Sequence, residues 1–163
     1  ASTASWLQQV PLIGITTKQP ESLTFSRKGQ SLKLAQHTDF IAVSGLPTES
    51  VEVPEAEVVF VGFGITAPEY RWDDYANIDV SGKIVLIMNN DPEDDPNLFE
   101  GRRRLYYGRW DYKYANAAAH GAIGAIIIHT EPSAGYPFSV VQTSWSGEES
   151  ELRGESGPRV KLK

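Results

Sequence analysis

The chain has 163 residues, 40% of them hydrophobic and 22% charged, and its formal net charge is −6 at pH 7. These proportions are ordinary for a globular protein, and the length fits a single domain, 1–163. The negative charge argues against nucleic acid as a partner. No apolar run reaches the ~20 residues of a membrane-spanning helix, which argues against a membrane. The lack of cysteine excludes disulfides and thiolate metal sites.

The N-terminal part of the chain predicts short β-strands. Residues 6–15 mix apolar and polar side chains and predict a helix end that runs into an edge strand. Residues 23–27 and 31–34 alternate with period two, and the glycine-containing segment 28–30 between them predicts a hairpin with a three-residue loop. Residues 40–43 predict a further short strand.

The centre of the chain predicts a strand–helix–strand unit. Residues 57–64 and 82–88 are short apolar runs typical of buried strands. The Ala-rich segment 113–120 predicts a helix that stops at Gly121, and residues 125–129 predict another buried strand. A strand, a helix and a second strand in this order form a βαβ unit, in which the two strands run parallel.

Two acidic loops flank the second of these strands. Residues 65–79 are aromatic and acidic without a clear period, and we expect an ordered loop whose aromatic side chains are partly buried. Residues 89–97 hold four carboxylates and two prolines, but lack the glycine and the bidentate glutamate that an EF-hand loop requires. We therefore expect a solvated acidic loop, with a calcium site as the open alternative.

The C-terminal part has weaker signals. Residues 138–142 are short and apolar, and residues 143–158 are polar and rich in Gly and Ser, with Trp145 as the one expected anchor. Residues 159–163 alternate with lysines and predict an edge strand.

Residues 62–67 follow an apolar strand and match the G-x-G-x-x-A form of a dinucleotide-binding motif. That chemistry needs a helix directly after the motif, because the helix N-terminus holds the pyrophosphate. Here Pro68 and several acidic residues follow instead. We expect a glycine bend between a strand and a loop rather than a cofactor site.

The triplet His37-Thr38-Asp39 contains two residue types that bind zinc. A catalytic zinc site needs at least three protein ligands and a base. The other histidines, His120 and His129, fall at the ends of predicted elements. We therefore expect no metal and no other cofactor in this chain.

The most promising binding surface follows the second acidic loop. It combines arginine, tyrosine and tryptophan, the residue types enriched in binding hot spots, and its candidate contact residues are Arg102, Arg103, Tyr106, Tyr107, Arg109 and Trp110. Arginine can hold a carboxylate through two parallel hydrogen bonds. The alternative is an insertion packed by its own aromatic rings, with arginines paired to the acidic loop. No nucleophile triad can be identified, so the chain alone is not expected to be an enzyme.

Four motifs follow one another in the centre of the chain: a Gly-Lys-led apolar strand at 82–87, an Arg/Gly-rich loop at 101–108, an Ala-rich helix at 113–120 and a Gly-Ala-led apolar strand at 121–128. In this order they resemble the protease-associated (PA) domain. Further segments are similar to the PA domain inserted in bacterial di-zinc aminopeptidases, namely 59–65, 68–70, 72–75, 106–110, 135–137, 140–142 and 144–147. The resemblance covers the chain from about Trp6 to its end.

The resemblance implies an α+β, mostly β fold with a β-barrel-like sheet core, flanking helices and one βαβ unit, its core at about 55–147. It implies that the chain is a fragment inserted in a longer metallopeptidase. The implied role is a non-catalytic lid or interaction module of a secreted zinc aminopeptidase, extracellular or periplasmic. The implied partners are the catalytic peptidase domain of the same polypeptide and a peptide substrate. Zinc is expected in that catalytic domain, because its His-x-Asp and Glu-Glu ligands have no match here.

Two alternatives stay open. The chain could be a stand-alone peptide- or glycan-binding module that uses Tyr70, Trp72 and Trp145. A nucleotide-dependent enzyme would depend on residues 62–67 alone.

Overall fold

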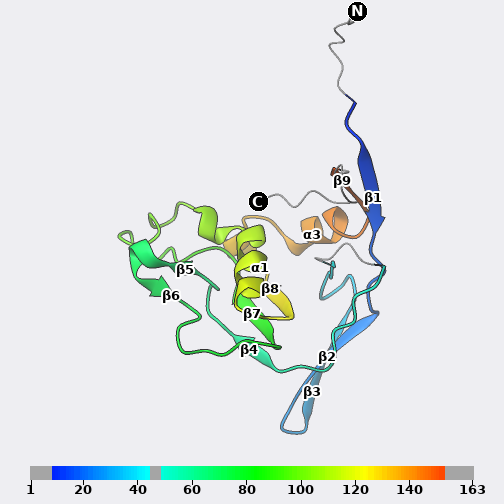
Figure 1. Cartoon of the computed structure of the whole chain (residues 1–163), viewed down its shortest axis with the longest axis horizontal. Helices are drawn as coiled ribbons and strands as arrows, with labels where there is room; N and C mark the ends of the chain where they lie inside the picture. The colour runs from blue at the N-terminus through cyan, green and yellow to red at the C-terminus, as the bar shows by residue number, and fades with distance from the viewer. Residues whose placement is uncertain (1–8, 45–48, 153–163) are drawn as a thin grey trace, which may run out of the picture. The chain divides into compact units, whose positions relative to one another are not determined.

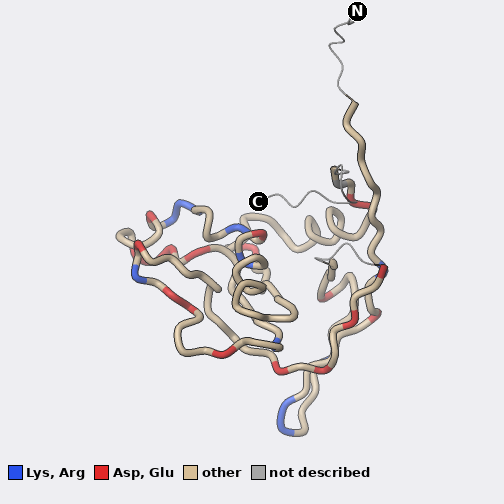
Figure 2. Tube along the Cα trace, in the orientation of Figure 1, with Lys and Arg blue, Asp and Glu red and all other residues tan. Residues whose placement is uncertain are grey.

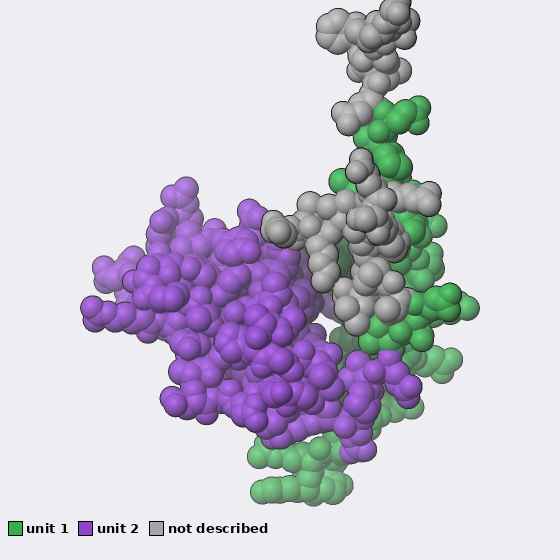
Figure 3. Space-filling model, in the orientation of Figure 1, with its two compact units in different colours: residues 1–51, 139–163 green, residues 52–138 purple. Residues whose placement is uncertain are grey.

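The computed structural model describes residues 9–44 and 49–152. Its chain divides into two compact units, one made of residues 1–51 and 139–163 and the other of residues 52–138 (Figure 3). We call them unit 1 and unit 2. That residues 1–163 form one domain stays a prediction.

Unit 2 contains a three-stranded parallel sheet (Figure 1). Its strands, in spatial order, are β4 (Val58–Phe60), β7 (Ile84–Met88) and β8 (Gly124–Ile128). The chain crosses from β7 to β8 through helix α1 (Trp110–Ala119). Both strand pairs are parallel, with Ile84 opposite Val58 on one side and Gly124 on the other. The predicted βαβ unit is therefore confirmed.

Strand β7 lies at the centre of the main hydrophobic core. Val85 and Ile87 are fully buried and pack with residues from the flanking segments, including Ala117 on α1. Helix α1 ends where predicted: Gly121 adopts a left-handed conformation with φ of +83° and its N–H bonds to the carbonyl of Ala118. Glycine takes this conformation without the steric cost that a Cβ atom brings.

The aromatic segment 65–79 is ordered, as expected, and contains short regular elements. These are β5 (Thr66–Ala67), the 3-10 helix η1 (Pro68–Tyr70) and β6 (Trp72–Asp73), with β5 and β6 antiparallel. Their aromatic side chains join a second core cluster around Ile65, Ala67 and Phe99, all fully buried.

Unit 1 contains the predicted hairpin, formed by β2 (Ser22–Arg27) and β3 (Gln30–Ala35). The loop has two residues rather than three, because Gln30 pairs with Arg27 in the ladder. Lys28 and Gly29 both have positive φ, +47° and +79°, as expected for the turn type whose twist matches that of the strands. The strand predicted at 40–43 is wrong: this region contributes only an isolated bridge between Gln36 and Phe40.

A second pair of strands in unit 1 is far apart in sequence. Strand β1 (Leu12–Thr16) runs antiparallel to β9 (Glu148–Leu152). The edge strand near residue 15 is thus confirmed, whereas β9 was not predicted. The helix end expected from residue 6 and the edge strand expected at 159–163 lie wholly or partly outside the described residues.

Three further short helices lie in the described part of the chain. They are η2 (Tyr106–Gly108), α2 (Glu131–Ala134) and α3 (Phe138–Ser144). Segment 138–142 is therefore helical. The sheets are small and separate, and the described strands form no closed barrel, so the barrel-like part of the fold prediction is corrected to an open α+β arrangement. Within the described residues, no helix is long and apolar enough to cross a membrane.

Candidate functional site

The six predicted contact residues occupy the connection from β7 to α1 in unit 2. They fall into two groups by exposure. Arg102, Arg103, Tyr106 and Arg109 are exposed, and the Tyr106 side chain retains 57% of its accessible surface. Tyr107 and Trp110 are half-buried. The structure therefore presents four of the six to solvent and uses the other two in packing.

Beneath the exposed residues lies a cluster of aromatic rings centred on Phe99. The Phe99 ring centroid is 4.5 Å from that of Tyr70 and 5.6 Å from those of Trp72 and Tyr107. Tyr112, on the first turn of α1, lies 5.2 Å from Tyr107. Edge-to-face pairs at such distances contribute about 0.5–1.5 kcal/mol each beyond simple burial. The tyrosines and Trp72 thus form a base for the arginine-bearing segment.

Hydroxyl groups fix this aromatic base to the 65–79 segment. The Tyr112 hydroxyl accepts a hydrogen bond from the Thr66 N–H at 3.0 Å and donates to the Thr66 carbonyl at 3.1 Å. The Tyr107 hydroxyl donates to the Glu69 carboxylate. This bond raises the pKa of Tyr107 to about 12 and lowers the pKa of Glu69.

Trp110 turns inward at the start of α1. Its indole N–H donates to the side-chain oxygen of Asn89 at 2.8 Å, and Asn89 is only 1% exposed. Tyr70 and Trp72, candidates for ligand stacking in the stand-alone module, are likewise half-buried against Phe99. Trp145, in unit 1, retains 36% exposure.

Arg104 has the most hydrogen bonds of the three consecutive arginines, and it was not among the predicted contact residues. Its Nε donates to the side-chain oxygen of Asn90 at 2.9 Å, and its terminal nitrogen donates to the backbone carbonyls of Ser133 and Ala134. Arg103 forms an exposed ion pair with Glu100 at 3.3 Å. The hydrogen bond between the arginines and the 89–97 loop thus joins Arg104 to the Asn90 side chain and not to a carboxylate.

The first carboxylate of the acidic loop is buried, which corrects the expectation of a wholly solvated loop. Asp91 is 2% exposed, and its Oδ2 accepts a hydrogen bond from the Leu105 N–H at 2.9 Å. Burial raises the pKa of Asp91. Glu93, Asp94 and Asp95 are exposed as expected. The Asp91 carboxylate therefore fastens the C-terminal end of the arginine-bearing segment.

A buried lysine lies in the same region. Lys113, on α1, has no exposed surface, and its Nζ donates to the Phe63 carbonyl at 2.5 Å. Burial lowers the pKa of Lys113 to about 8, against a smaller opposing effect of Asp91. The side-chain amide of Asn116, one turn further on, donates to the Gly64 carbonyl at 2.9 Å.

These two bonds explain the glycine motif at 62–67. Gly62 and Gly64 have φ of +61° and +65°, and the carbonyls of Phe63 and Gly64 are bound by α1. The motif is followed by β5 and the three-residue η1, so the long helix that would hold a pyrophosphate is absent at this position. The glycines serve a tight turn that packs against α1.

The three histidines have separate environments. The His120 ring stacks on Tyr75 with centroids 4.0 Å apart, and the His129 ring lies 5.3 Å from that of Tyr136. His37 belongs to unit 1. Across the described ranges, no group of three or more His, Asp or Glu side chains is placed to hold a metal ion.

An open hollow of about 430 Å³ lies beside the exposed arginines. It is lined by Glu93, Asp94, Pro96, Gly101 and Arg102. Figure 2 shows basic and acidic residues close together in this part of unit 2. The hollow is therefore bordered by acidic and basic side chains, which suit polar contacts.

Comparison with protein families identifies one domain in the chain. The family model of the PA domain matches residues 53–158, which include the whole connection from β7 to α1. No curated protein and no solved structure matches the chain. Because the family model covers more than half of the sequence, the chain belongs to the protease-associated (PA) domain family, a family of non-catalytic accessory domains.

Proposed function

We propose that this PA domain is the lid and substrate- or partner-binding module of a secreted zinc-dependent aminopeptidase. The observation that carries the proposal is the pairing of an exposed cationic and aromatic surface with a buried aromatic base. We define the recognition surface as Arg102, Arg103, Tyr106 and Arg109, all exposed. The backbone of Arg109 is held by the hydrogen bond from its N–H to the Tyr106 carbonyl at 3.1 Å, so less entropy is lost when this arginine binds a ligand.

The recognition surface is partly organised without a ligand. The Arg109 guanidinium lies 5.9 Å from the centre of the Tyr106 ring. At exposed sites such a cation–π contact contributes about 0.5–1 kcal/mol. The Tyr106 ring also lies 5.2 Å from that of Tyr112, whose hydroxyl is bound to Thr66. The exposed ring is therefore connected to the fixed base of the site.

The chemistry of this surface favours a ligand with a carboxylate and an apolar side chain. A guanidinium can donate two parallel hydrogen bonds to a carboxylate, and a tyrosine ring offers a flat apolar contact. A peptide with a free C-terminus or an acidic side chain has both features. In this proposal, zinc and the hydrolytic step belong to a separate catalytic domain. The role proposed for this chain is to bind or orient the peptide.

The test uses the complete enzyme that contains this chain. Replacing Arg109 with alanine should lower kcat/KM by about tenfold for a peptide that carries a carboxylate, because a hot-spot contact is worth more than ~1 kcal/mol. Arg27→Ala is the matched control, since Arg27 is also exposed but lies on the β2–β3 hairpin of unit 1. Equal kcat/KM values for the two variants would contradict the proposal. A parent protein without a peptidase domain would favour the stand-alone peptide- or glycan-binding module.

A further inference from the structure

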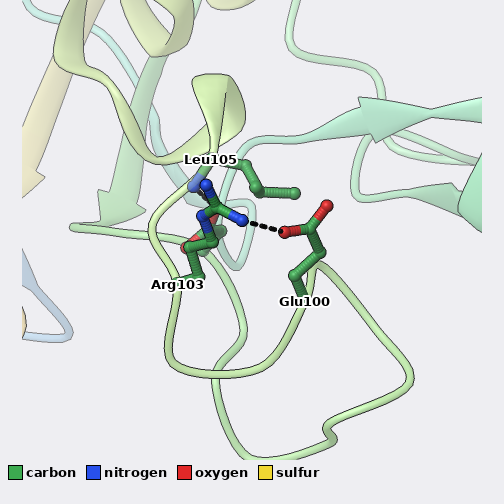
Figure 4. Close-up of polar contacts among 4 residues, drawn as sticks. Glu100, Arg103 and Leu105 are labelled. Carbon is green, nitrogen blue, oxygen red and sulfur yellow. Dashed lines mark hydrogen bonds and ion pairs between the residues drawn. The ribbon is translucent and has the colours of Figure 1, made fainter.

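Residues 99–105, which we call the arginine loop, hold three consecutive arginines in three different environments. Arg104 is bound by Asn90 and by two backbone carbonyls. Arg103 pairs with Glu100 (Figure 4), yet 80% of its side chain stays exposed. Arg102 is exposed, and among the residues that the structure describes it has no recorded hydrogen bond or ion pair. Of the three side chains, that of Arg102 is the least restrained.

The backbone at this point is also largely unpaired. The Gly101 N–H donates to the Leu98 carbonyl at 2.9 Å, and the Leu105 N–H donates to Asp91 at 2.9 Å. Between them, within the described ranges, the recorded backbone bond is the long one from Arg103 to Glu100, at 3.5 Å. Residues 99–102 form a turn. When this turn opens into an extended segment, the N–H and C=O groups around Arg102 can bind another protein in strand fashion.

The arginine loop is anchored at both ends, so it can open without unfolding the rest of unit 2. Phe99 is fully buried on one side, and the Asp91–Leu105 bond holds the other. Phe99 and Glu100 also have positive φ, +49° and +58°, which is unfavourable for residues with a Cβ atom. Opening of the loop would relieve this strain. Exposed loop tips of this kind are the preferred sites of proteolytic cleavage.

We propose that the Arg102–Arg103 peptide bond is a processing site for a serine protease of trypsin-like specificity. Such enzymes select an arginine or lysine before the cleaved bond, and the Arg102 side chain can enter a specificity pocket without breaking a contact. Cleavage after Arg104 would require the loss of its bonds to Asn90 and Ser133. Water adds across the bond, leaving a carboxylate on Arg102 and an amine on Arg103, and nothing is oxidised or reduced.

Cleavage here has a defined structural effect. The two new chain ends stay attached to unit 2, one through the buried Phe99 and the other through the bond from the Leu105 N–H to Asp91. Arg102 is then no longer held beside Arg103. The cut therefore divides the recognition surface while the aromatic base beneath it stays intact.

The experiment is brief digestion of the full chain with trypsin under native conditions, followed by mass spectrometry. Within residues 9–152, the first products should end at Arg102 and begin at Arg103. Lys28 provides a built-in comparison, because it is exposed but lies in a two-residue turn between paired strands. A first cut after any other basic residue in this range, such as Lys28, Arg71, Arg103 or Arg104, would overturn the proposal.

Two variants distinguish the chosen bond from its neighbours. Arg102→Gln should slow the appearance of the Arg103 amino terminus by at least about tenfold, because a trypsin-like protease does not select glutamine before the cleaved bond. Arg104→Gln should leave that cleavage at least as fast as in the wild type, because it removes an anchor and not the selected side chain. Equal slowing by both substitutions would contradict the assignment of Arg102.

A third variant separates local opening from global unfolding. Val85→Ala weakens the core of the sheet, where Val85 is fully buried. If cleavage proceeds through opening of the arginine loop alone, its rate should change by less than about twofold in this variant. A rate that rises in proportion to the loss of global stability would show that the loop is cut only in the unfolded chain, and the proposal would fail.

Discussion

The ammonium group of Lys113 donates a hydrogen bond to the carbonyl oxygen of Phe63, joining the middle of α1 to the glycine turn after β4. The lysine is fully buried, and burial lowers its pKa from 10.5 to about 8. A base with a lowered folded-state pKa binds fewer protons in the folded chain than in the unfolded chain. Its contribution to stability therefore rises with pH between the two values.

The first prediction follows from this rise of stability with pH. Between about pH 7.5 and 9.5, Lys113 should add roughly 1–2 kcal/mol to the free energy of unfolding of the wild type. Lys113→Met should remove this increase, whereas Lys33→Met, at an exposed position on β3, should retain it. Urea unfolding at several pH values measures the difference. A parallel pH dependence in wild type and Lys113→Met would show that the amine is not buried in the folded protein.

The second prediction concerns Asp91. Because burial raises its pKa, this carboxyl contributes most to stability at acid pH, and the contribution falls as the pH rises from the ordinary aspartate value through the raised one. Asp91→Asn keeps an acceptor for the Leu105 N–H and should remain within about 1 kcal/mol of the wild type at pH 7. Asp91→Ala leaves that N–H without its acceptor and should cost about 1–3 kcal/mol. Equal effects of the two substitutions in chemical denaturation would argue against the anchoring role.

The third prediction tests the aromatic base. Phe99 is fully buried beneath the recognition surface, so Phe99→Ala should destabilise unit 2 by about 3–5 kcal/mol. Phe60→Ala is the control, because the Phe60 side chain is 55% exposed, and the expected loss there is below about 1 kcal/mol. Thermal unfolding, monitored by near-ultraviolet circular dichroism, measures the loss of stability in both variants. Similar losses for the two would place Phe99 outside the core.

The fourth prediction concerns tyrosine ionisation. Tyr75 and Tyr107 both have pKa values raised to about 12, Tyr75 through burial and Tyr107 through its bond to Glu69. In a spectrophotometric titration, Glu69→Gln should bring Tyr107 back toward the ordinary tyrosine value near 10 and leave Tyr75 unchanged. Tyr107→Phe should remove one late-titrating group from the curve. If Glu69→Gln leaves the titration curve unaltered, the Tyr107–Glu69 bond is absent in solution.

Residue patterns predicted the centre of the fold because the signals there are local. Strand β7 is a short β-branched run after Gly82, and α1 is an Ala-rich segment stopped by Gly121, so periodicity and glycine chemistry define both. Strand β9 has the sequence Glu-Glu-Ser-Glu-Leu, which does not alternate apolar and polar residues. Its extended conformation comes from pairing with β1, a contact that no local pattern reveals.

The site was predictable in composition but not in the arrangement of its side chains. Three adjacent arginines look equivalent in the sequence, and all three are exposed, yet the structure records side-chain hydrogen bonds from Arg104 to Asn90 and Ser133 and none from Arg102 among the described residues. Aspartate is exposed in most proteins, so the burial of Asp91 could not be expected from its residue type. The burial of Asp91 is explained by the hydrogen bond that its carboxylate accepts from the Leu105 N–H, which is a tertiary contact across the loop.

The pairing of β1 with β9 also has a consequence for the order of folding during synthesis. Leu12 lies opposite Leu152, so this sheet closes only after most of the described chain has been made. Residues 52–138 form unit 2 from one continuous stretch, and its sheet contacts close shorter loops. Contacts between nearby segments form faster than distant ones. During synthesis on the ribosome, unit 2 can therefore fold before β9 has been made and before β1 can pair with it.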